Sequence, residues 1–315
     1  MKLLITGATG FIGQHLLENK FFTKDNIEIR ILSRKDNPVL RFSQNIKSYK
    51  GDLSEISTIE NAFSGIDIVI NLAAELKDND KFDSTNILGT KNIISMMKKY
   101  NVKNIIHLSS VGVVGKQYSF SPVNITEATE CFPKNNYEIS KLESEKIFIE
   151  AAKKNNFDLI ILRPTNVFGE FHPKLFLLNF MNHLKNHKLI LYSNNAVVNY
   201  VYVKDVTNAI IHFVENNYTE PIYNIGKSMK LTDFIHSTSD ILSVKPSIYK
   251  VPAIIIHFLE LTNYFGINSF KNKFHSISNA VEYNDNKIES IFGYEYGIEA
   301  GLKNIFDFYK TNGKL

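Results

Sequence analysis

The first half of the chain alternates short, continuously apolar runs with segments of helical spacing. The pattern predicts a buried strand at Lys2–Thr6, a short strand at Ile46–Lys50, and further strands at Ile27–Leu32, Asp67–Asn71, Asn104–Leu108 and Asp158–Leu162. The segments between them predict helices at Phe11–Lys20, Asn86–Lys99 and Tyr137–Lys154. Strands that are apolar along their whole length and alternate with helices are typical of a parallel sheet covered on both faces. We therefore expect an α/β protein with a doubly wound parallel sheet.

The pattern changes after Pro164, where predicted helices become longer and predicted strands fewer. Helices are expected at Lys174–Asn186 and Glu299–Lys310 and from starts near Asp205, Thr232 and Pro252, with strands at Leu189–Tyr192 and Asn199–Val203. We interpret this part as a smaller, mostly helical region over the carboxyl edge of the sheet, where ligands bind in open α/β proteins. We assign residues 1–165, with 200–226 returning, to the sheet domain, and 166–199 and 227–315 to a substrate-binding region.

Composition narrows the class of protein. Of the 315 residues, 44% are hydrophobic and 22% are charged, values typical of a globular protein with a core. A formal net charge of +4 is too small over this length to indicate nucleic-acid binding. The single cysteine, Cys131, excludes an internal disulfide and a cysteine-based zinc site, and it fits a reducing, cytoplasmic compartment.

No apolar stretch is long enough to span a bilayer, so we expect no membrane span. The closest stretch, Val251–Ile267, contains His257, Glu260 and Asn263. These polar residues favour an amphipathic helix packed on the protein over an interfacial or partner-facing one. The N-terminus is interrupted by glycines and lacks the unbroken apolar run of a signal peptide.

A glycine-rich turn, Thr6–Gly13, follows the first predicted strand directly and opens the first helix. In this position Gly7 lets the chain turn, Gly10 lets the backbone approach a pyrophosphate, and Gly13 lets the helix pack closely on the sheet. Strand, turn and helix in this order favour a dinucleotide site over a tight turn without a ligand.

The spacing G-x-x-G-x-x-G in this turn, within the run TGATGFIG, resembles the extended branch of the short-chain dehydrogenase/reductase superfamily. The resemblance implies a Rossmann-type domain that binds NAD(P). Its motifs run from Met1 to about Gly226 and continue more loosely to Glu299–Leu302. It places the cofactor against the turn, at Gly7, Thr9, Gly10, Phe11, Ile12 and Gly13.

The end of the second predicted strand bears on the choice between NAD and NADP. An acidic residue there, about 20 residues beyond the glycine turn, would bind the ribose 2′-hydroxyl of NAD. The chain instead has Ser33 and Arg34, which could hold a 2′-phosphate, so NADP is favoured over NAD. In the alternative, Arg34 stacks on adenine or is solvated, and NAD is bound.

Further contacts follow only from the resemblance. It implies that Asp52 and Leu53 contact adenine, although Asp52 could instead cap a helix at Glu55–Phe63. It places Leu72, Ala73 and Ala74 along the nicotinamide ribose, Pro164 beside the nicotinamide, and Asn166 at a phosphate of the substrate. Asn86 is expected to make buried hydrogen bonds and Asp205 to cap the next helix.

Tyr137 and Lys141 stand four residues apart on a predicted helix, so they share one face. A phenol, with a pKa near ~10, is a poor base at neutral pH, and a nearby ammonium and the cationic ring of the cofactor would lower that pKa. The resemblance implies that Tyr137 exchanges the proton of an alcohol or ketone and that Lys141 also holds the nicotinamide ribose. It places the residue that polarises the carbonyl at Ser110, with Ser109 as the fallback.

Departures from the family pattern reduce the number of reactions that the chain is expected to catalyse. Val111-Gly112 stand in place of the Asp-Glu pair of sugar-nucleotide 4,6-dehydratases. Val198-Asn199 stand in place of an arginine that pairs with diphosphate in many UDP-sugar epimerases. The cysteine that follows the catalytic serine in GDP-fucose synthase is also missing, and His172 is either an acid in its place or an ordinary loop histidine.

Hydride transfer at a carbinol or ketone is the interpretation that remains. We favour reduction of a 4-keto nucleotide sugar over nucleotide-sugar 4-epimerisation with retained NAD. Reductases of steroid- or flavonoid-like alcohols and a non-catalytic NAD(P) sensor are further alternatives. The resemblance also implies a homodimer that pairs through the helices at Asn86–Lys99 and Tyr137–Lys154.

Overall fold

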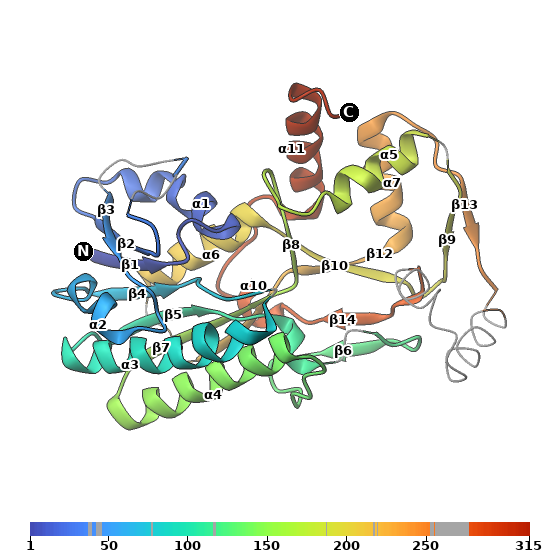
Figure 1. Cartoon of the computed structure of the whole chain (residues 1–315). Helices are drawn as coiled ribbons and strands as arrows, with labels where there is room; N and C mark the ends of the chain where they lie inside the picture. The colour runs from blue at the N-terminus through green and yellow to red at the C-terminus, as the bar shows by residue number, and fades with distance from the viewer. Residues whose placement is uncertain are drawn as a thin grey trace.

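A computed structural model describes residues 1–36, 40–41, 46–76, 78–115, 118–186, 188–216, 218, 220–252, 255 and 277–315. Within them, seven parallel strands form one sheet in the order β11-β7-β5-β4-β1-β2-β3 (Figure 1). The bounds of these strands are β1 Lys2–Thr6, β2 Glu28–Ser33, β3 Ile46–Lys50, β4 Ile68–Asn71, β5 Asn104–Leu108, β7 Asp158–Pro164 and β11 Ile222–Ile225. The predicted doubly wound α/β fold is confirmed.

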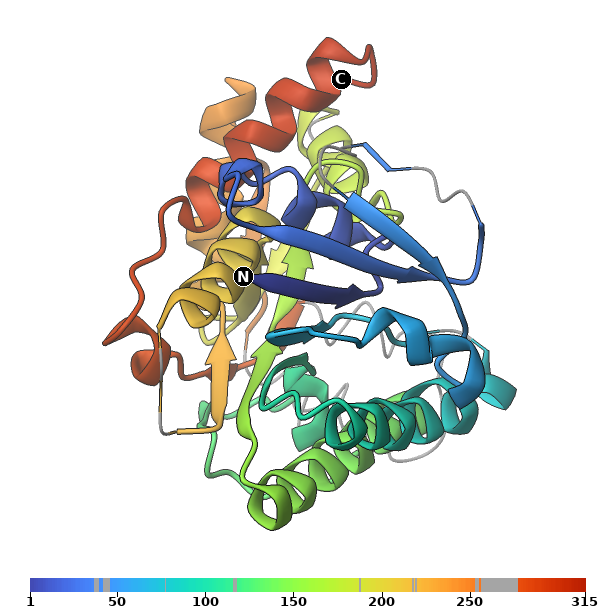
Figure 2. The same ribbon diagram turned by 90° about the vertical axis from the view of Figure 1, so that its left-hand side faces the viewer.

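Alternate side chains of each strand enter two hydrophobic cores, one on each face of the sheet. Ile5 of β1 packs with α1 and α6, whereas Leu4 packs with α3 and α4 on the opposite face. The bounds of these helices are α1 Phe11–Leu17, α3 Gly89–Lys99, α4 Asn136–Asn155 and α6 Val203–Glu215. Figure 2 shows α3 and α4 side by side along one face of the sheet. Because helices cover both faces, the carboxyl ends of the strands are the open edge.

The strand order reverses at β1, which pairs with β2 on one side and with β4 on the other. The strands then follow outward in chain order in both directions. A reversal of this kind leaves a crevice at the carboxyl ends of the two central strands, where open α/β sheets bind ligands. The candidate site is therefore expected beyond Thr6 and Asn71, the last residues of β1 and β4.

The region after β7 contains more strand than predicted. Three small sheets have the orders β12-β10-β8, β13-β9 and β14-β6. Their strands are β6 Val123–Ile125, β8 Asn166–Phe168, β9 Ile190–Tyr192, β10 Val197–Tyr202, β12 Lys227–Lys230, β13 Ile248–Lys250 and β14 Val281–Tyr283. The remaining α-helices of the described residues are α2 Ile56–Ile59, between β3 and β4, and, after β7, α5 Phe176–Lys185, α7 Leu231–Leu242, α10 Asn286–Glu289 and α11 Gly297–Thr311. The strands predicted at Leu189–Tyr192 and Asn199–Val203 are confirmed as β9 and β10, with slightly shifted bounds, whereas the other strands of the small sheets are too short to show a periodic pattern and were not predicted.

Local hydrogen bonds explain two further differences from prediction. Helix α1 ends at Leu17 and not at Lys20, because the Asn19 side chain accepts the N–H of Phe21 and starts a short 3₁₀ turn. Asp205 does not cap α6, since it lies inside that helix. Its carboxylate accepts the N–H groups of residues 295, 296 and 297 at 3.0, 3.1 and 2.9 Å, and so ties the start of α11 to α6.

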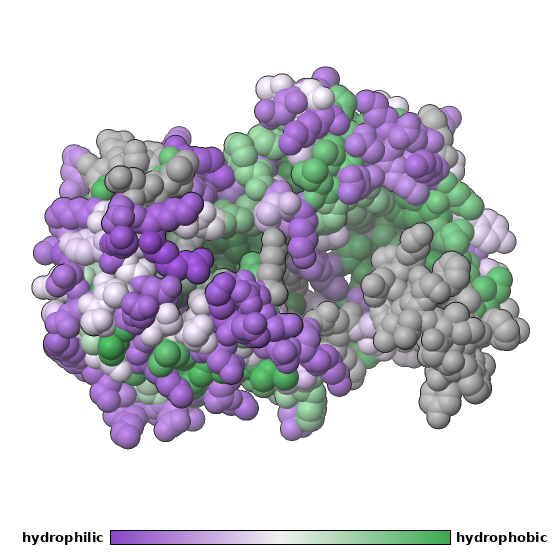
Figure 3. All heavy atoms as spheres, in the orientation of Figure 1, coloured by the Kyte–Doolittle hydropathy of each residue, from purple (hydrophilic) through white to green (hydrophobic). Residues whose placement is uncertain are grey.

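Among the described residues, no helix has the length and apolar character required to cross a bilayer. The helix predicted from Pro252 and the apolar stretch Val251–Ile267 lie almost entirely outside the described residues. Figure 3 shows the surface hollowed between the sheet domain and the C-terminal region.

Candidate active site

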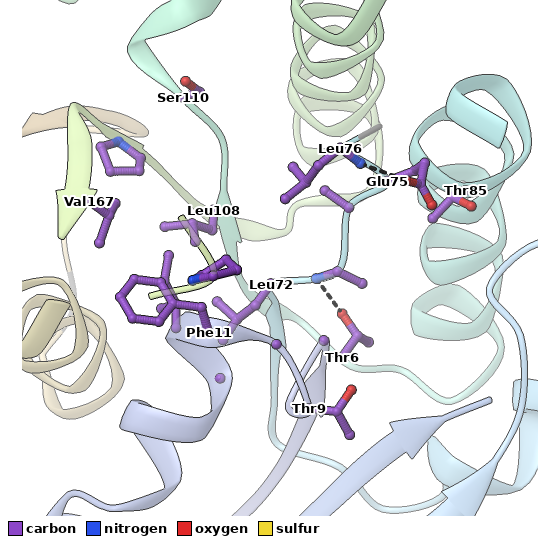
Figure 4. A pocket seen from close by; sticks show the side chains of 18 of the residues that line it. Thr6, Thr9, Phe11, Leu72, Glu75, Leu76, Thr85, Leu108, Ser110 and Val167 are labelled. Carbon is purple, nitrogen blue, oxygen red and sulfur yellow. Dashed lines mark hydrogen bonds between the residues drawn. The ribbon is translucent and has the colours of Figure 1, made fainter. Parts of the chain in front are cut away.

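A cavity of 740 Å³ opens at the carboxyl ends of the central strands. It brings together every residue predicted to contact cofactor or substrate. These are Gly7, Thr9, Gly10, Phe11, Ile12, Gly13, Ser33, Arg34, Asp52, Leu53, Leu72, Ala73, Ala74, Ser110, Tyr137, Lys141, Pro164 and Asn166. Figure 4 shows Thr9 and Phe11 of the glycine-rich turn on one side and Leu108 and Ser110, at the end of β5, on another. The roles of these residues stay predictions, but their convergence is a property of the fold.

The glycine-rich turn has the shape that a dinucleotide needs. Gly7 has a φ of +71°, and a Cβ there would lie 2.6 Å from the backbone nitrogen of Ala73. A Cβ on Gly13 would lie 2.4 Å from the Gly7 carbonyl oxygen, so both glycines are required by close backbone packing. A Cβ on Gly10 would meet only that same oxygen, at 3.1 Å. Gly10 therefore leaves its backbone open to the cavity, which fits a bound pyrophosphate.

The end of the cavity that is predicted to hold adenosine is polar. Ser33 is buried and its hydroxyl accepts the N–H of Lys35 at 3.1 Å, whereas Arg34 is exposed. The Asp52 carboxylate accepts the N–H and the hydroxyl of Ser54 at 2.9 and 2.7 Å. Helix α2 begins only at Ile56, so the alternative in which Asp52 caps that helix is wrong. Asp52 instead forms a local turn at the cavity wall.

Tyr137 and Lys141 face the cavity from α4, but they are not hydrogen-bonded to each other. Lys141 Nζ donates to the Leu108 carbonyl at 2.8 Å and lies 3.3 Å from His107 Nε2. Burial, and then the negative charge of Glu138, raises the pKa of Tyr137 to about 12. Burial lowers the pKa of Lys141 to about 8. Within the chain itself, burial raises the pKa of Tyr137 and no lowering by Lys141 opposes it, so the lysine part of the expectation is wrong, whereas the lowering expected from the cationic ring of the cofactor stays a prediction.

Both candidate serines line the cavity at the end of β5. The Ser110 hydroxyl accepts the N–H of Gly112 at 3.1 Å at the start of a 3₁₀ turn, Val111–Val114. The Ser109 hydroxyl is buried and has no hydrogen-bond partner within the described part of the chain. A hydroxyl that accepts one bond can still donate its proton, so Ser110 keeps the capacity to polarise a carbonyl.

Asn86 makes the buried hydrogen bonds predicted for it. Its side-chain oxygen accepts the N–H of Glu75 at 2.8 Å, and its amide nitrogen donates to the Ser140 hydroxyl at 2.9 Å. Ser140 in turn donates to the Tyr137 carbonyl at 2.8 Å. Asn86 thus links the segment after β4 to the first turn of the helix that carries Tyr137.

The end of the cavity around Asn166 contains Tyr200 and Phe176, to which sequence reasoning assigned no role, and His172, which it left as either an acid or an ordinary loop histidine. Tyr200 lies beside Asn166 in the β8–β10 pairing, and within the described residues its hydroxyl makes no hydrogen bond. Phe176 stacks on the Tyr200 ring at 5.7 Å. His172 is held edge-on between Phe11 and Phe176, at 4.8 and 5.6 Å, and burial lowers its pKa. The strand and helix here come from segments distant in sequence, so no local pattern could have revealed this grouping.

Comparison with known proteins gives the same fold and one family. Residues 3–226 match the family model described as the NAD dependent epimerase/dehydratase family. A dTDP-D-glucose 4,6-dehydratase of Dictyostelium discoideum is 32% identical over 76% of this chain and 60% of its own length. A decarboxylating sterol-4-alpha-carboxylate 3-dehydrogenase of Saccharomyces cerevisiae is 28% identical over 66% of this chain and 63% of its own length. The chain thus spans about three fifths of the length of these curated relatives.

A solved structure agrees over nearly the whole chain. The UDP-glucose 4-epimerase of Thermotoga maritima, crystallised with UDP-glucose, superposes with a TM-score of 0.75 and covers 99% of both chains. Its sequence identity of 18% is low, so this likeness concerns the fold alone.

Proposed function

This chain belongs to the NAD dependent epimerase/dehydratase family, and we propose that it is an NAD(P)-dependent oxidoreductase that reduces a 4-keto nucleotide sugar. The observation that carries the proposal is the convergence of Ser110, Tyr137 and Lys141 in one cavity with the complete set of predicted cofactor contacts. When bound, the nicotinamide cofactor supplies the hydride. In the division we propose, residues 1–165 and 200–226 hold it, and 166–199 and 227–315 bind the sugar nucleotide.

The state of Tyr137 supports reduction. Because burial raises its pKa to about 12, the phenol keeps its proton at neutral pH. A protonated tyrosine can donate to the oxygen of a ketone as that oxygen becomes an alkoxide, while Ser110 donates a hydrogen bond to the same oxygen. Lys141 Nζ donates to the Leu108 carbonyl and lies beside His107 Nε2, which leaves one of its three N–H donors free to face the cavity. With this donor Lys141 holds the ribose of the cofactor.

Nucleotide-sugar 4-epimerisation is the second candidate, and the family match supports it equally. An epimerase oxidises and then reduces the same carbon, so it keeps its cofactor between turnovers, whereas a reductase exchanges it. We expect purified protein to lose cofactor on gel filtration and to consume NADPH stoichiometrically with a 4-keto nucleotide sugar. Retained NAD, with interconversion of 4-epimers in a nucleotide-sugar panel, would favour the epimerase. Tight cofactor binding without turnover on any member of the panel would favour a sensor.

The cofactor preference is expected to depend on Arg34. Ser33 and Arg34 line the end of the cavity that we propose to hold adenosine, and the second predicted strand does not end in an acidic residue. We expect NADPH to bind at least as tightly as NADH and Arg34→Ala to weaken NADPH selectively, because a phosphate loses its charged partner. Fluorescence titration of both cofactors measures this, with Lys35→Ala as the neighbouring control. A strong NADH preference that Arg34→Ala leaves unchanged would contradict the assignment.

We also propose that two copies pair through α3 and α4. Ile139 on α4 and Leu88, just before α3, are 49% and 42% exposed, so both apolar side chains are available to a second copy on this side of the molecule. Ile139→Glu should convert the dimer to a monomer in sedimentation velocity, whereas Ile56→Glu, on α2, should not. A wild-type chain that sediments as a monomer would rule the pairing out.

A further inference from the structure

Three buried polar residues stand side by side on neighbouring strands next to Lys141. In the sheet register, Asn71 of β4 is paired with Thr6 of β1 on one side and with His107 of β5 on the other. Their exposed fractions are 1% for Thr6, 3% for Asn71 and 1% for His107. Polar groups this deep must hydrogen-bond one another, since an unpaired one is costly away from water.

Hydrogen bonds connect this row to the lysine. The Thr6 hydroxyl lies 2.6 Å from Asn71 Oδ1, and Asn71 Nδ2 lies 3.1 Å from His107 Nδ1. The other ring nitrogen, Nε2, lies 3.3 Å from Lys141 Nζ. Because Lys141 also donates to the Leu108 carbonyl, two of its three ammonium donors are directed into the protein. The third is free to face the cavity.

The hydrogen bonds that connect Asn71, His107 and Lys141 can form with the protons in two different positions. An ammonium at Lys141 only donates, so it needs a lone pair on His107 Nε2. The ring proton is then on Nδ1, and Asn71 must turn its amide oxygen toward it. A neutral amine at Lys141 can accept, so the ring proton can move to Nε2, with the Asn71 NH₂ group donating to Nδ1. A terminal amide can serve both arrangements because one end donates and the other accepts.

We propose that His107 is a positioning residue that anchors Lys141 in both of its protonation states by exchanging tautomer, with Asn71 turning its amide to match. This inference rests on the proposed function only in taking Lys141 as the catalytic lysine. It explains why the two polar residues are buried at the end of apolar strands. The tautomer of the His107 ring therefore changes with the charge of Lys141, while the ring itself stays neutral.

The surroundings agree with a neutral ring. Burial, and then the positive charge of Lys141, lower the pKa of His107 well below its ordinary value. Tyr137, one turn away on α4, lines the same cavity as Lys141. The charge of Glu145, also on α4, acts on Lys141, and Arg163 of β7 pairs with Glu145. Ser144 of α4 lies 3.4 Å from Nε2 and offers a second acceptor when that nitrogen carries the proton.

The first test needs no substitution and no substrate. The full chain, labelled with nitrogen-15 histidine and carbon-13 lysine, is titrated by NMR from about pH 6 to about pH 10, a range that spans the pKa of Lys141. We expect the His107 spectrum to change from the Nδ1–H to the Nε2–H tautomer with the same midpoint as the Lys141 signal. A tautomer that stays unchanged while Lys141 titrates would overturn the proposal.

Two amide substitutions of His107 distinguish a role in anchoring Lys141 from a role that is limited to packing beside Asn71. In His107→Gln the amide reaches the place of Nε2, and in His107→Asn it reaches the place of Nδ1. We expect Gln to keep the wild-type Lys141 midpoint. We expect Asn to lower it by roughly one pH unit, a tenfold change, because a buried ammonium loses an acceptor. Equal midpoints in the two variants would overturn the proposal, even if both bind cofactor normally.

If the anchoring role of His107 is wrong, the experiments give a different result than if the proposed function is wrong. If Tyr137→Phe abolishes turnover but the tautomer of His107 never changes, the enzyme assignment stands and the anchoring role is wrong. If the tautomer follows Lys141 but no substrate turns over, the anchoring role stands and the reaction was misassigned.

Discussion

Replacing Tyr137 with Phe is expected to lower kcat by roughly 10²–10⁴-fold, the usual contribution of a general acid. The substitution keeps the ring, which is partly buried and whose centroid lies 6.1 Å from that of Phe82, and it removes only a hydroxyl that makes no hydrogen bond in the described structure. Folding, cofactor affinity and substrate KM should therefore change little. Steady-state kinetics on the substrate identified by the product panel, with cofactor affinity measured in parallel, test this.

Three comparison variants sharpen the result. Lys141→Met should lower kcat further and also weaken the cofactor, because the lysine has a predicted ribose contact. Ser110→Ala should lower kcat less than the tyrosine change, and Ser109→Ala should have the larger effect only if Ser109 is the polarising residue. Near-wild-type turnover by Tyr137→Phe would sink the assignment, and His172 would become the first candidate acid.

Replacing Glu145 with Leu is expected to lower the free energy of unfolding by about 3–5 kcal/mol, as breaking a buried ion pair usually does. The Glu145 carboxylate accepts Nε and Nη2 of Arg163 at 3.0 and 2.6 Å, with side chains only 1% and 4% exposed. Burial alone would lower the pKa of Arg163, but Glu145 more than offsets this, so the guanidinium stays charged and would be left unpaired. Urea unfolding with a linear extrapolation measures the loss.

A surface pair on the same helix provides the control. Glu143 lies 3.8 Å from Lys146, and both side chains are about half exposed. Glu143→Ala should change stability by no more than about 0.5 kcal/mol. The double variant Glu145→Leu with Arg163→Met should recover much of the loss, since it leaves no buried charge. Equal stability of Glu145→Leu and the wild type would show that the buried pair is not needed.

Local sequence determined most strands of the main sheet and identified residues that line the candidate site. The alternation of strand and helix patterns predicted six of the seven strands of the main sheet, and β1, β3 and β5 have the predicted bounds. The missing strand, β11, has only four residues, with Asn224 among them. The glycine turn could be predicted because Gly7 and Gly13 are required by contacts within one strand–turn–helix unit and the strand beside it. The spacing of Tyr137 and Lys141 sufficed because one helix places both.

Only the tertiary structure decided what these residues touch. Thr6, Asn71 and His107 come from three separate segments, and the sheet register alone brings them to Lys141. The same packing raises the pKa of Tyr137, which the neighbouring lysine was expected to help lower, since burial depends on everything that covers a group and not on its neighbours in sequence. Asp205 was recognised as a helix-terminal residue, but it serves α11, 90 residues further on, and not its own helix. A periodic pattern reports which side chains are buried, whereas the partners of a buried polar group depend on how distant segments pack.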